Sequence, residues 1–138
     1  HTASAIAPLP LIPAPVEAKR HAGNFTVGTG TVISIVAGDA DARRSAEYLA
    51  GLLKRTRGLA LEVRAETTPS PASIRLERSA QAPVTQKEGY RLDVDSTGIR
   101  IDARDGAGLF YGAISAWQLM TPDARKGAVA VPGVSIRD

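Results

Sequence analysis

The most regular alternation of apolar and charged residues in the chain lies between residues 90 and 104. It divides into the runs YRLDVD and IRIDAR, separated by the turn Ser96-Thr97-Gly98. A period of two is the pattern of strands with one buried and one solvated face, so the two runs predict a β-hairpin. On the solvated face, facing acids and arginines are each expected to contribute about 0.2–1 kcal/mol.

Apolar residues recur with the period of an α-helix over residues 41–57. Asp39 or Asp41 offers an N-cap before this segment, and Gly58 follows its last turn, where a C-cap glycine is favoured. The basic residues of the last turn suit the negative end of the helix dipole. The stripe expected to face the core consists of Ala42, Ala46, Leu49, Leu52 and Leu53.

A second helix is predicted over residues 107–120, after the turn that begins at Asp105 and before Pro122. It is apolar nearly all round, and a helix without a polar face is usually buried on both sides. One side can contact the sheet of a domain this small. We therefore hypothesise that the other side packs against a further domain.

The remaining strands are shorter and less regular. Residues 16–27 predict one or two strands with a turn at 21–24, and residues 129–136 predict a last strand interrupted at Pro132-Gly133. Strands are also expected at 31–36, 59–65 and 73–78, with a polar loop at 79–87. This order predicts an α+β fold over residues 16–138, a two-layer domain with a mainly antiparallel or mixed sheet and two helices packed on it. Four prolines make residues 1–15 a Pro-rich N-terminal arm.

The composition argues against several classes of function. The 138 residues carry a formal charge of +3, but lysines and arginines are scattered among acids, so we expect no nucleic-acid partner. The chain has no cysteine, which excludes disulfides and thiolate catalysis. No apolar run reaches the ~20 residues of a membrane span, and no signal peptide is apparent. The Ala- and Arg-rich composition favours a bacterial source.

Histidines and glycines offer little chemistry. His1 and His21 lie at the terminus and in a predicted turn, and no HExxH motif occurs, so we expect no metal. Gly106, Gly108 and Gly112 resemble a phosphate loop only superficially, since no Walker lysine follows them. They are expected to shape the turn and to allow close helix packing.

Four aspartates are candidates for a catalytic pair of the kind that glycosidases use. Asp93, Asp95 and Asp102 lie on the solvated face of the predicted hairpin beside arginines, and Asp105 precedes the second helix. Arginine neighbours keep carboxylates ionised rather than poised as acids. We therefore assign no catalytic, cofactor-binding or metal-binding residue, and we discount the glycosylation sequon Asn24-Phe25-Thr26 in a bacterial chain.

Several motifs together are similar to one family. They are EGYRLDV at 88–94, GIRIDA at 98–103, AGLFYG at 107–112 and AWQLM at 116–120. The opening LIPAP at 11–15 with GNF at 23–25, and the closing VPGVSIRD at 131–138, fit the same pattern. The chain resembles the N-terminal non-catalytic domain of glycoside hydrolase family 20 β-N-acetylhexosaminidases, with AGLFYG the most specific run.

This resemblance implies a zincin-like accessory domain whose partner is a catalytic (β/α)8 barrel. In the family the barrel supplies an Asp–Glu pair, and the substrate's acetamide oxygen is the nucleophile, so the glycosidic bond is cleaved with retention. None of those residues maps onto this chain, which we expect to be inactive alone. The resemblance implies a parent enzyme that hydrolyses terminal GlcNAc or GalNAc residues, without a cofactor, in the periplasm or outside the cell.

Two alternatives remain open. One is a stand-alone carbohydrate-binding or interaction module, and the other is an equivalent domain of another glycosidase family, such as α-glucuronidases or O-GlcNAc hydrolases. Sugar-binding modules usually present exposed aromatic platforms. Phe110, Tyr111 and Trp117 lie on the apolar second helix, where we expect them in the core instead.

Overall fold

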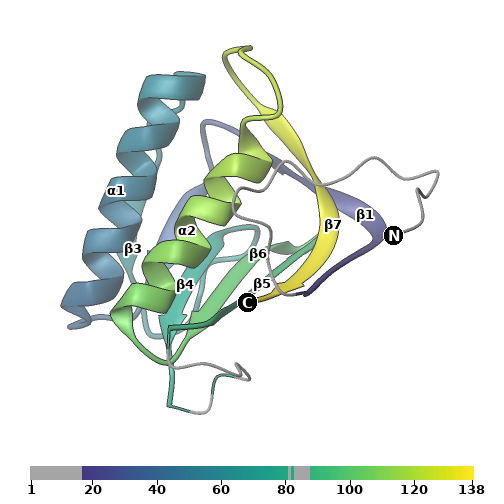
Figure 1. Ribbon diagram of the computed structural model, residues 1–138. Helices are drawn as coiled ribbons and strands as arrows, with labels where there is room; N and C mark the ends of the chain where they lie inside the picture. Colours follow the sequence, from purple (N-terminus) through teal and green to yellow (C-terminus); the bar gives the residue numbers. More distant parts are fainter. Residues whose placement is uncertain (1–16, 81, 83–87) are drawn as a thin grey trace.

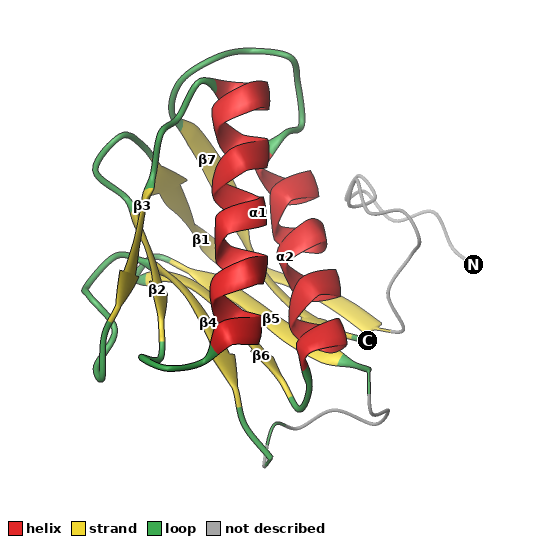
Figure 2. Cartoon of the chain, turned by 90° about the vertical axis from the view of Figure 1, so that its left-hand side faces the viewer, coloured by secondary structure: helices red, strands yellow, loops and turns green. Residues whose placement is uncertain are grey.

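A single mixed β-sheet covered on one face by two helices forms the fold (Figures 1 and 2). The computed structural model describes residues 17–80, 82 and 88–138, so the expected N-terminal arm at 1–15 lies outside the described residues. The α+β, two-layer fold expected from the sequence is confirmed. In chain order the elements are β1 Glu17–Val27, β2 Val32–Ile35, α1 Ala40–Arg57, β3 Glu62–Ala65, β4 Ile74–Arg78, β5 Tyr90–Asp95, β6 Gly98–Ala103, α2 Gly106–Met120 and β7 Val129–Arg137.

The sheet has seven strands in the order β1-β7-β5-β6-β4-β2-β3. The half made of β1, β7, β5 and β6 is antiparallel, whereas β6, β4, β2 and β3 pair in parallel. The predicted hairpin is confirmed as β5–β6, with Tyr90 opposite Ala103 and Asp95 opposite Gly98. It lies at the centre of the sheet, next to the point where the strand direction changes.

The strand registers align one apolar row beneath the helices. Adjacent strands place Ile35 beside Leu76, Leu76 beside Ile101, and Leu92 between Ile101 and Ile136. All five side chains are at most 1% exposed. Because side chains alternate along a strand, the polar neighbours of this row point to the opposite side of the sheet, which we call the back face.

Both helices begin with aspartate caps, as expected for Asp39. The Asp39 carboxylate accepts a hydrogen bond from Ala42 N at 3.1 Å, and Asp105 accepts one from Gly108 N at 3.0 Å. Gly58 ends α1 in the left-handed region, with φ 70°, as its position after the last turn predicted. These caps satisfy backbone groups that the helix itself leaves unpaired.

The two helices run side by side in the same direction (Figure 2). At their start, a Cβ on Gly106 would lie only 2.9 Å from the Asp41 carboxyl carbon; at their end, Trp117 Nε1 donates to Thr56 Oγ1 at 3.1 Å. Close packing also explains Gly112, because a Cβ there would lie 2.5 Å from Ile101 Cγ2. The packing role expected for Gly108 and Gly112 is confirmed, since a Cβ on Gly108 would likewise meet the backbone of Gly89.

Three strand boundaries differ from the prediction. β1 is one strand of 11 residues, within the expected one or two, but it has a register shift between Arg20 and Asn24 where a turn was predicted. β3 begins only at Glu62, after two buried leucines. β7 continues through Pro132. Because β5 pairs only with the residues of β7 from Val134 onward, the N–H group that proline lacks interrupts no hydrogen bond to β5.

Candidate functional site

The hairpin carboxylates lie on the back face, where they form ion pairs. Asp102 is only 4% exposed, so the face expected to be solvated is partly buried. Its oxygen lies 3.3 Å from Arg91 Nη2 and 3.0 Å from Arg100 Nε, while Arg91 Nε lies 2.9 Å from Asp93. This arrangement holds Asp93 and Asp102 against guanidinium groups.

The other two candidate carboxylates shape turns. Asp95 accepts hydrogen bonds from the hydroxyl and the backbone N–H of Thr97, and these bonds lower the pKa of Asp95 below its ordinary value. Asp105 is the N-cap of α2. A glycosidase needs one carboxyl that stays protonated near neutral pH, whereas the Thr97 hydrogen bonds favour the ionised form of Asp95.

His21 is not part of a metal-binding cluster of described residues. His21 is exposed on β1, with its Nδ1 3.3 Å from the carbonyl oxygen of Ala22, and His1 lies outside the described residues. Within the part of the chain that the structure describes, no three His, Cys, Asp or Glu side chains are placed to hold an ion. Neither described helix is long and apolar enough to span a membrane.

The outer face of the two helices is the most unusual surface of the domain. Phe110 is 36% exposed, Tyr111 49% and Tyr48 of α1 46%, so the expectation that Phe110 and Tyr111 belong to the core is wrong. Only Trp117, of the three aromatics on α2, packs against the core cluster. Phe110 and Tyr111 are exposed because α2 packs on the sheet through its opposite side. The buried residues of that side include Leu109, Ala113, Ala116 and Met120.

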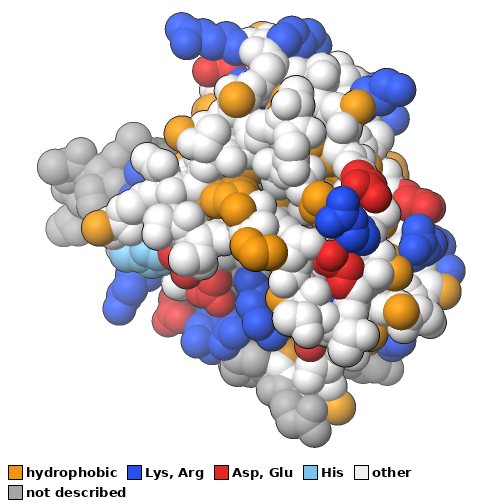
Figure 3. Space-filling view, turned by 180° about the vertical axis from the view of Figure 1, so that it is seen from behind, with side chains coloured by type: hydrophobic (Ala, Val, Ile, Leu, Met, Phe, Trp, Pro, Cys, Tyr) orange, Lys and Arg blue, Asp and Glu red, His pale blue; other side chains and the backbone are white. Residues whose placement is uncertain are grey.

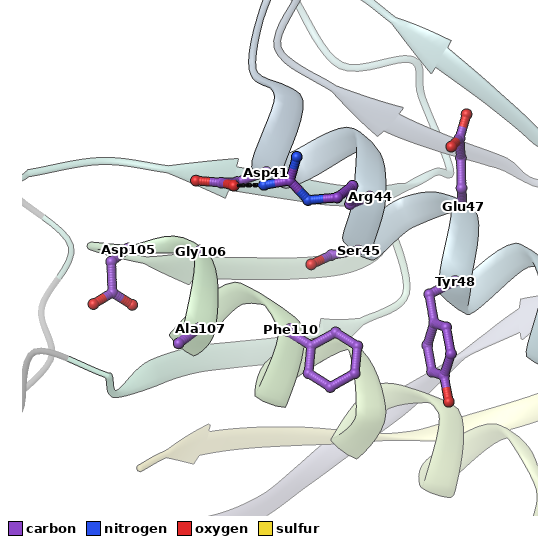
Figure 4. A pocket seen from close by; sticks show the side chains of 9 residues that line it. All are labelled: Asp41, Arg44, Ser45, Glu47, Tyr48, Asp105, Gly106, Ala107 and Phe110. Carbon is purple, nitrogen blue, oxygen red and sulfur yellow. Dashed lines mark hydrogen bonds and ion pairs between the residues drawn. The ribbon is translucent and has the colours of Figure 1, made fainter.

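The exposed aromatic rings form one connected cluster. The ring centroids of Tyr48 and Phe110 are 5.2 Å apart at 48°, and those of Phe110 and Tyr111 are 6.2 Å apart at 65°. Tyr48 and Phe110 border a cleft of about 930 Å³ between the first turns of the helices (Figure 4). Its lining residues are Asp41, Arg44, Ser45, Glu47, Tyr48, Asp105, Gly106, Ala107 and Phe110.

Charges surround this cleft at the helix starts. Arg44 forms an ion pair with Asp41 (Figure 4), and Arg78 Nε lies 3.2 Å from Asp39. The Asp39 carboxylate, and to a smaller extent Asp41 and Asp105, raise the pKa of the Arg78 guanidinium. The acids offset the positive ends of two parallel helix dipoles, so their role is structural.

The exposed part of α2, by contrast, has no charge at all. The 15 residues from Gly106 to Met120 contain no Asp, Glu, Lys or Arg. Exposed aromatic side chains with few charges are typical of the buried centre of a protein–protein interface. The sequence shows that α2 lacks a charged face. Helical spacing separates Phe110, Tyr111 and Ile114 from Leu109 and Ala113, but it does not show which of the two sides faces the sheet.

A protein-family model matches nearly the whole chain. Residues 9–138 match the family model described as "Glycosyl hydrolase family 20, domain 2". A β-N-acetylhexosaminidase from Cellulomonas fimi is 30% identical over 128 residues, which cover 93% of this chain and 25% of that protein. The chain therefore spans about a quarter of the length of this relative.

Solved structures agree with this assignment. A mutant β-hexosaminidase from Streptomyces plicatus in complex with its product GlcNAc superposes with a TM-score of 0.78 at 35% identity, over 96% of this chain and 26% of that one. A β-N-acetylhexosaminidase from Streptomyces coelicolor A3(2) superposes with a TM-score of 0.76 at 34% identity, over 96% of this chain and 27% of that one. The sequence motifs and the three-dimensional fold thus point to the same group of proteins.

Proposed function

Because the chain belongs to glycosyl hydrolase family 20 as its domain 2, we propose that it is the non-catalytic accessory domain of a β-N-acetylhexosaminidase. The parent enzyme hydrolyses terminal GlcNAc or GalNAc residues, with the periplasm or the extracellular space as its place of action. The relatives that are β-N-acetylhexosaminidases support this activity. The engaged carboxylates of the hairpin support a non-catalytic role for the chain itself.

The proposed partner is the catalytic (β/α)8 barrel of the same parent protein, and the outer face of α1 and α2 is the surface that contacts it. The observation that carries this proposal is the uncharged outer side of α2, with Phe110 and Tyr111 exposed beside Tyr48. Covering these rings removes apolar area from water, at about 25 cal/mol for each Å². In this arrangement the barrel supplies the catalytic Asp–Glu pair, and the chain stabilises the barrel.

The exposed rings also favour a second candidate, a carbohydrate-binding module. Sugar rings stack on flat aromatic platforms, but the rings here are inclined to one another by 48° and 65°. Such tilted and edge-to-face packing presents an uneven surface that suits interlocking side chains better than a flat sugar ring. The interface role is therefore the better supported of the two.

A reconstitution experiment tests the proposal. The 138-residue chain is mixed with the separately produced catalytic domain of the parent, and turnover of a chromogenic N-acetylglucosaminide is followed with the thermal midpoint of the catalytic domain. We expect the chain to raise the midpoint or restore activity. The double variant Phe110→Ser/Tyr111→Ser should lose this effect, whereas Lys19→Ser, on exposed β1, should retain it.

Two outcomes would count against the interface. If the double variant stabilises the catalytic domain as well as the native chain does, the helix face is not the contact surface. If the helix face binds soluble chitooligosaccharides but not the catalytic domain, the chain is a carbohydrate-binding module.

A further inference from the structure

A second pocket lies on the back face of the sheet, away from the helices. It has a volume of about 410 Å³ and extends across strands β4, β6, β5, β7 and β1. We call it the back-face pocket; its polar lining includes His21, Ser73, Asp93, Asp95, Arg100 and Ser135. Its volume lies within the range of small-molecule sites, about 300–1,000 Å³.

One wall of this pocket is formed by the loop before β4. In the described part of the chain, Ala72 is the one non-glycine residue with positive φ, 53°, and it lines the pocket. The loop is fixed on both sides of it: Ser73 Oγ donates to Ser70 O at 2.8 Å, and Ile99 N donates to Ser73 O at 3.1 Å. Backbone strain of this kind persists where surrounding structure enforces it, and it gathers at ligand-binding sites.

The opposite wall is formed by the irregular part of β1. Arg20 pairs with Val134 and Asn24 with Pro132, so residues 21–23 lie opposite Gly133 alone. A Cβ on Gly133 would lie 2.8 Å from both His21 Nδ1 and Ala22 O, which shows how closely the bulge packs on β7. Bulges re-aim side chains and are frequent beside active and binding sites. This one carries His21, a lining residue of the pocket.

The floor of the pocket is held rigidly by charged side chains. Arg75 is 3% exposed, and its guanidinium donates to Ser34 Oγ at 2.8 Å and to Glu66 O at 3.2 Å. Arg100 bonds through Nε to Asp102 while half of its side chain stays exposed. Asp93 is about one-third exposed beside it. Donors and acceptors therefore stand side by side in fixed positions (Figure 3 shows basic and acidic side chains intermixed on this side of the molecule).

The charges of the lining indicate the class of ligand. Two arginines, Arg75 and Arg100, balance two aspartates, Asp93 and Asp95, so the pocket has no excess charge to attract an ion. A neutral molecule with many hydroxyl groups can donate to the carboxylates and accept from the guanidinium and hydroxyl groups at once. We propose that the back-face pocket binds a sugar residue of a neutral glycan. This goes beyond the proposed accessory role, and the pocket would stay open with the helix face covered.

An NMR titration of the 138-residue chain tests this proposal. The probe is N,N′-diacetylchitobiose, a neutral disaccharide, added to ¹⁵N-labelled protein. Because no Phe, Tyr or Trp lines the pocket, we expect a dissociation constant on the order of 1 mM, with shifts centred on the amides of Thr97, Gly98 and Ser135. His21→Ala and Arg100→Gln should each weaken binding by at least about 5-fold, and Arg43→Gln, on the exposed side of α1, should leave it unchanged.

Other results would overturn the proposal. Shifts centred on Tyr48 and Phe110 would place the sugar on the helix face. Larger shifts of the pocket amides with sulfate than with the disaccharide would make it an anion site. Native affinity in a folded Arg100→Gln protein and a folded His21→Ala protein, or no shifts with the native chain, would show that the pocket takes no sugar. None of these results depends on the catalytic domain, so failure here is separate from failure of the accessory role.

Discussion

The phenol oxygen of Tyr90 lies 2.5 Å from the hydroxyl oxygen of Ser115, and this hydrogen bond joins the central strand β5 to α2. Both residues are buried, at 2% and 8% exposure. Burial raises the pKa of Tyr90, so the phenol stays protonated. The backbone of Tyr90 also exchanges two hydrogen bonds with Asp138, at 3.2 and 3.0 Å. Tyr90 thus connects α2 to Asp138, the residue that follows β7.

Removing this hydroxyl should destabilise the domain. In Tyr90→Phe the ring is kept but the buried Ser115 hydroxyl loses its partner, which costs about 1–2 kcal/mol of unfolding free energy. Urea denaturation followed by circular dichroism measures the loss. The control is Tyr111→Phe, which removes a hydroxyl from a ring that is 49% exposed and should change little. Equal stability of both variants would show that the buried bond contributes nothing.

Two glycine-to-alanine changes in the helices should act in opposite directions. In Gly112→Ala the new methyl group would lie 2.5 Å from Ile101 Cγ2, so α2 must shift from the sheet, at a cost of about 1–3 kcal/mol. In Gly51→Ala the nearest atom is the end of the Arg55 side chain at 3.2 Å. That side chain can move, so the better helix propensity of alanine should stabilise α1 by up to about 1 kcal/mol. Thermal unfolding compares the stability of the two variants. A Gly112→Ala protein more stable than the native chain would contradict the close packing of α2 on Ile101.

Acid should weaken the domain partly through Glu66. Hydrogen bonds from Ser70 and then Ser34 lower the pKa of this carboxyl below its ordinary 4.5. A carboxyl with a lowered folded-state pKa contributes stability above the unfolded-state value, and this is lost as pH falls through the folded-state value. Glu66→Gln should therefore flatten the decline of the thermal midpoint below about pH 4.5.

The exposed Glu62 provides the comparison for this pH effect. Its side chain is 62% exposed on the edge strand β3, so Glu62→Gln should keep the native decline. The midpoint is measured by differential scanning calorimetry at a series of pH values. Parallel curves for the native chain and Glu66→Gln would show that the Ser34–Glu66–Ser70 bonds do not contribute to acid stability.

Two residues on opposite sides of α2, Leu109 and Tyr111, should respond differently to the same change. Leu109 is fully buried, so Leu109→Ser is expected to cost more than about 3 kcal/mol through the cavity and the buried hydroxyl. Tyr111 is exposed, so Tyr111→Ser should change stability by less than about 0.5 kcal/mol and reduce binding of a hydrophobic dye. Chemical denaturation and dye fluorescence measure both. A large loss of stability in Tyr111→Ser would show that the aromatic cluster is part of the core.

Local patterns in the sequence predicted the elements well. Alternation located the β5–β6 hairpin, and Asp39 and Gly58 marked the ends of α1, because caps and turns depend on residues close in the chain. Strand order was not predictable in this way. Alternation tells which side of a strand is apolar but not which strand lies beside it, so the parallel pairing of β4 with β6 came only from the structure.

The candidate surface was predictable only in part. The missing polar face of α2 was visible in the sequence, yet the exposure of Phe110 depends on how the helix is rotated against the sheet. Buried charges escaped prediction for a similar reason. The sequence predicts that Arg57 is a solvent-exposed cation at the end of α1. In the structure the loop before β7 covers its side chain and supplies Asp123 at 2.9 Å and the carbonyl oxygens of Gly127 and Ala128.

The most direct test of the account is the hydrolysis of a chromogenic N-acetylglucosaminide by the 138-residue chain alone. The account predicts no turnover above the uncatalysed rate, because the hairpin carboxylates are held in ion pairs and turns. Turnover that is lost in Asp93→Asn or Asp102→Asn would contradict it and would make the hairpin, rather than a partner barrel, the catalytic centre.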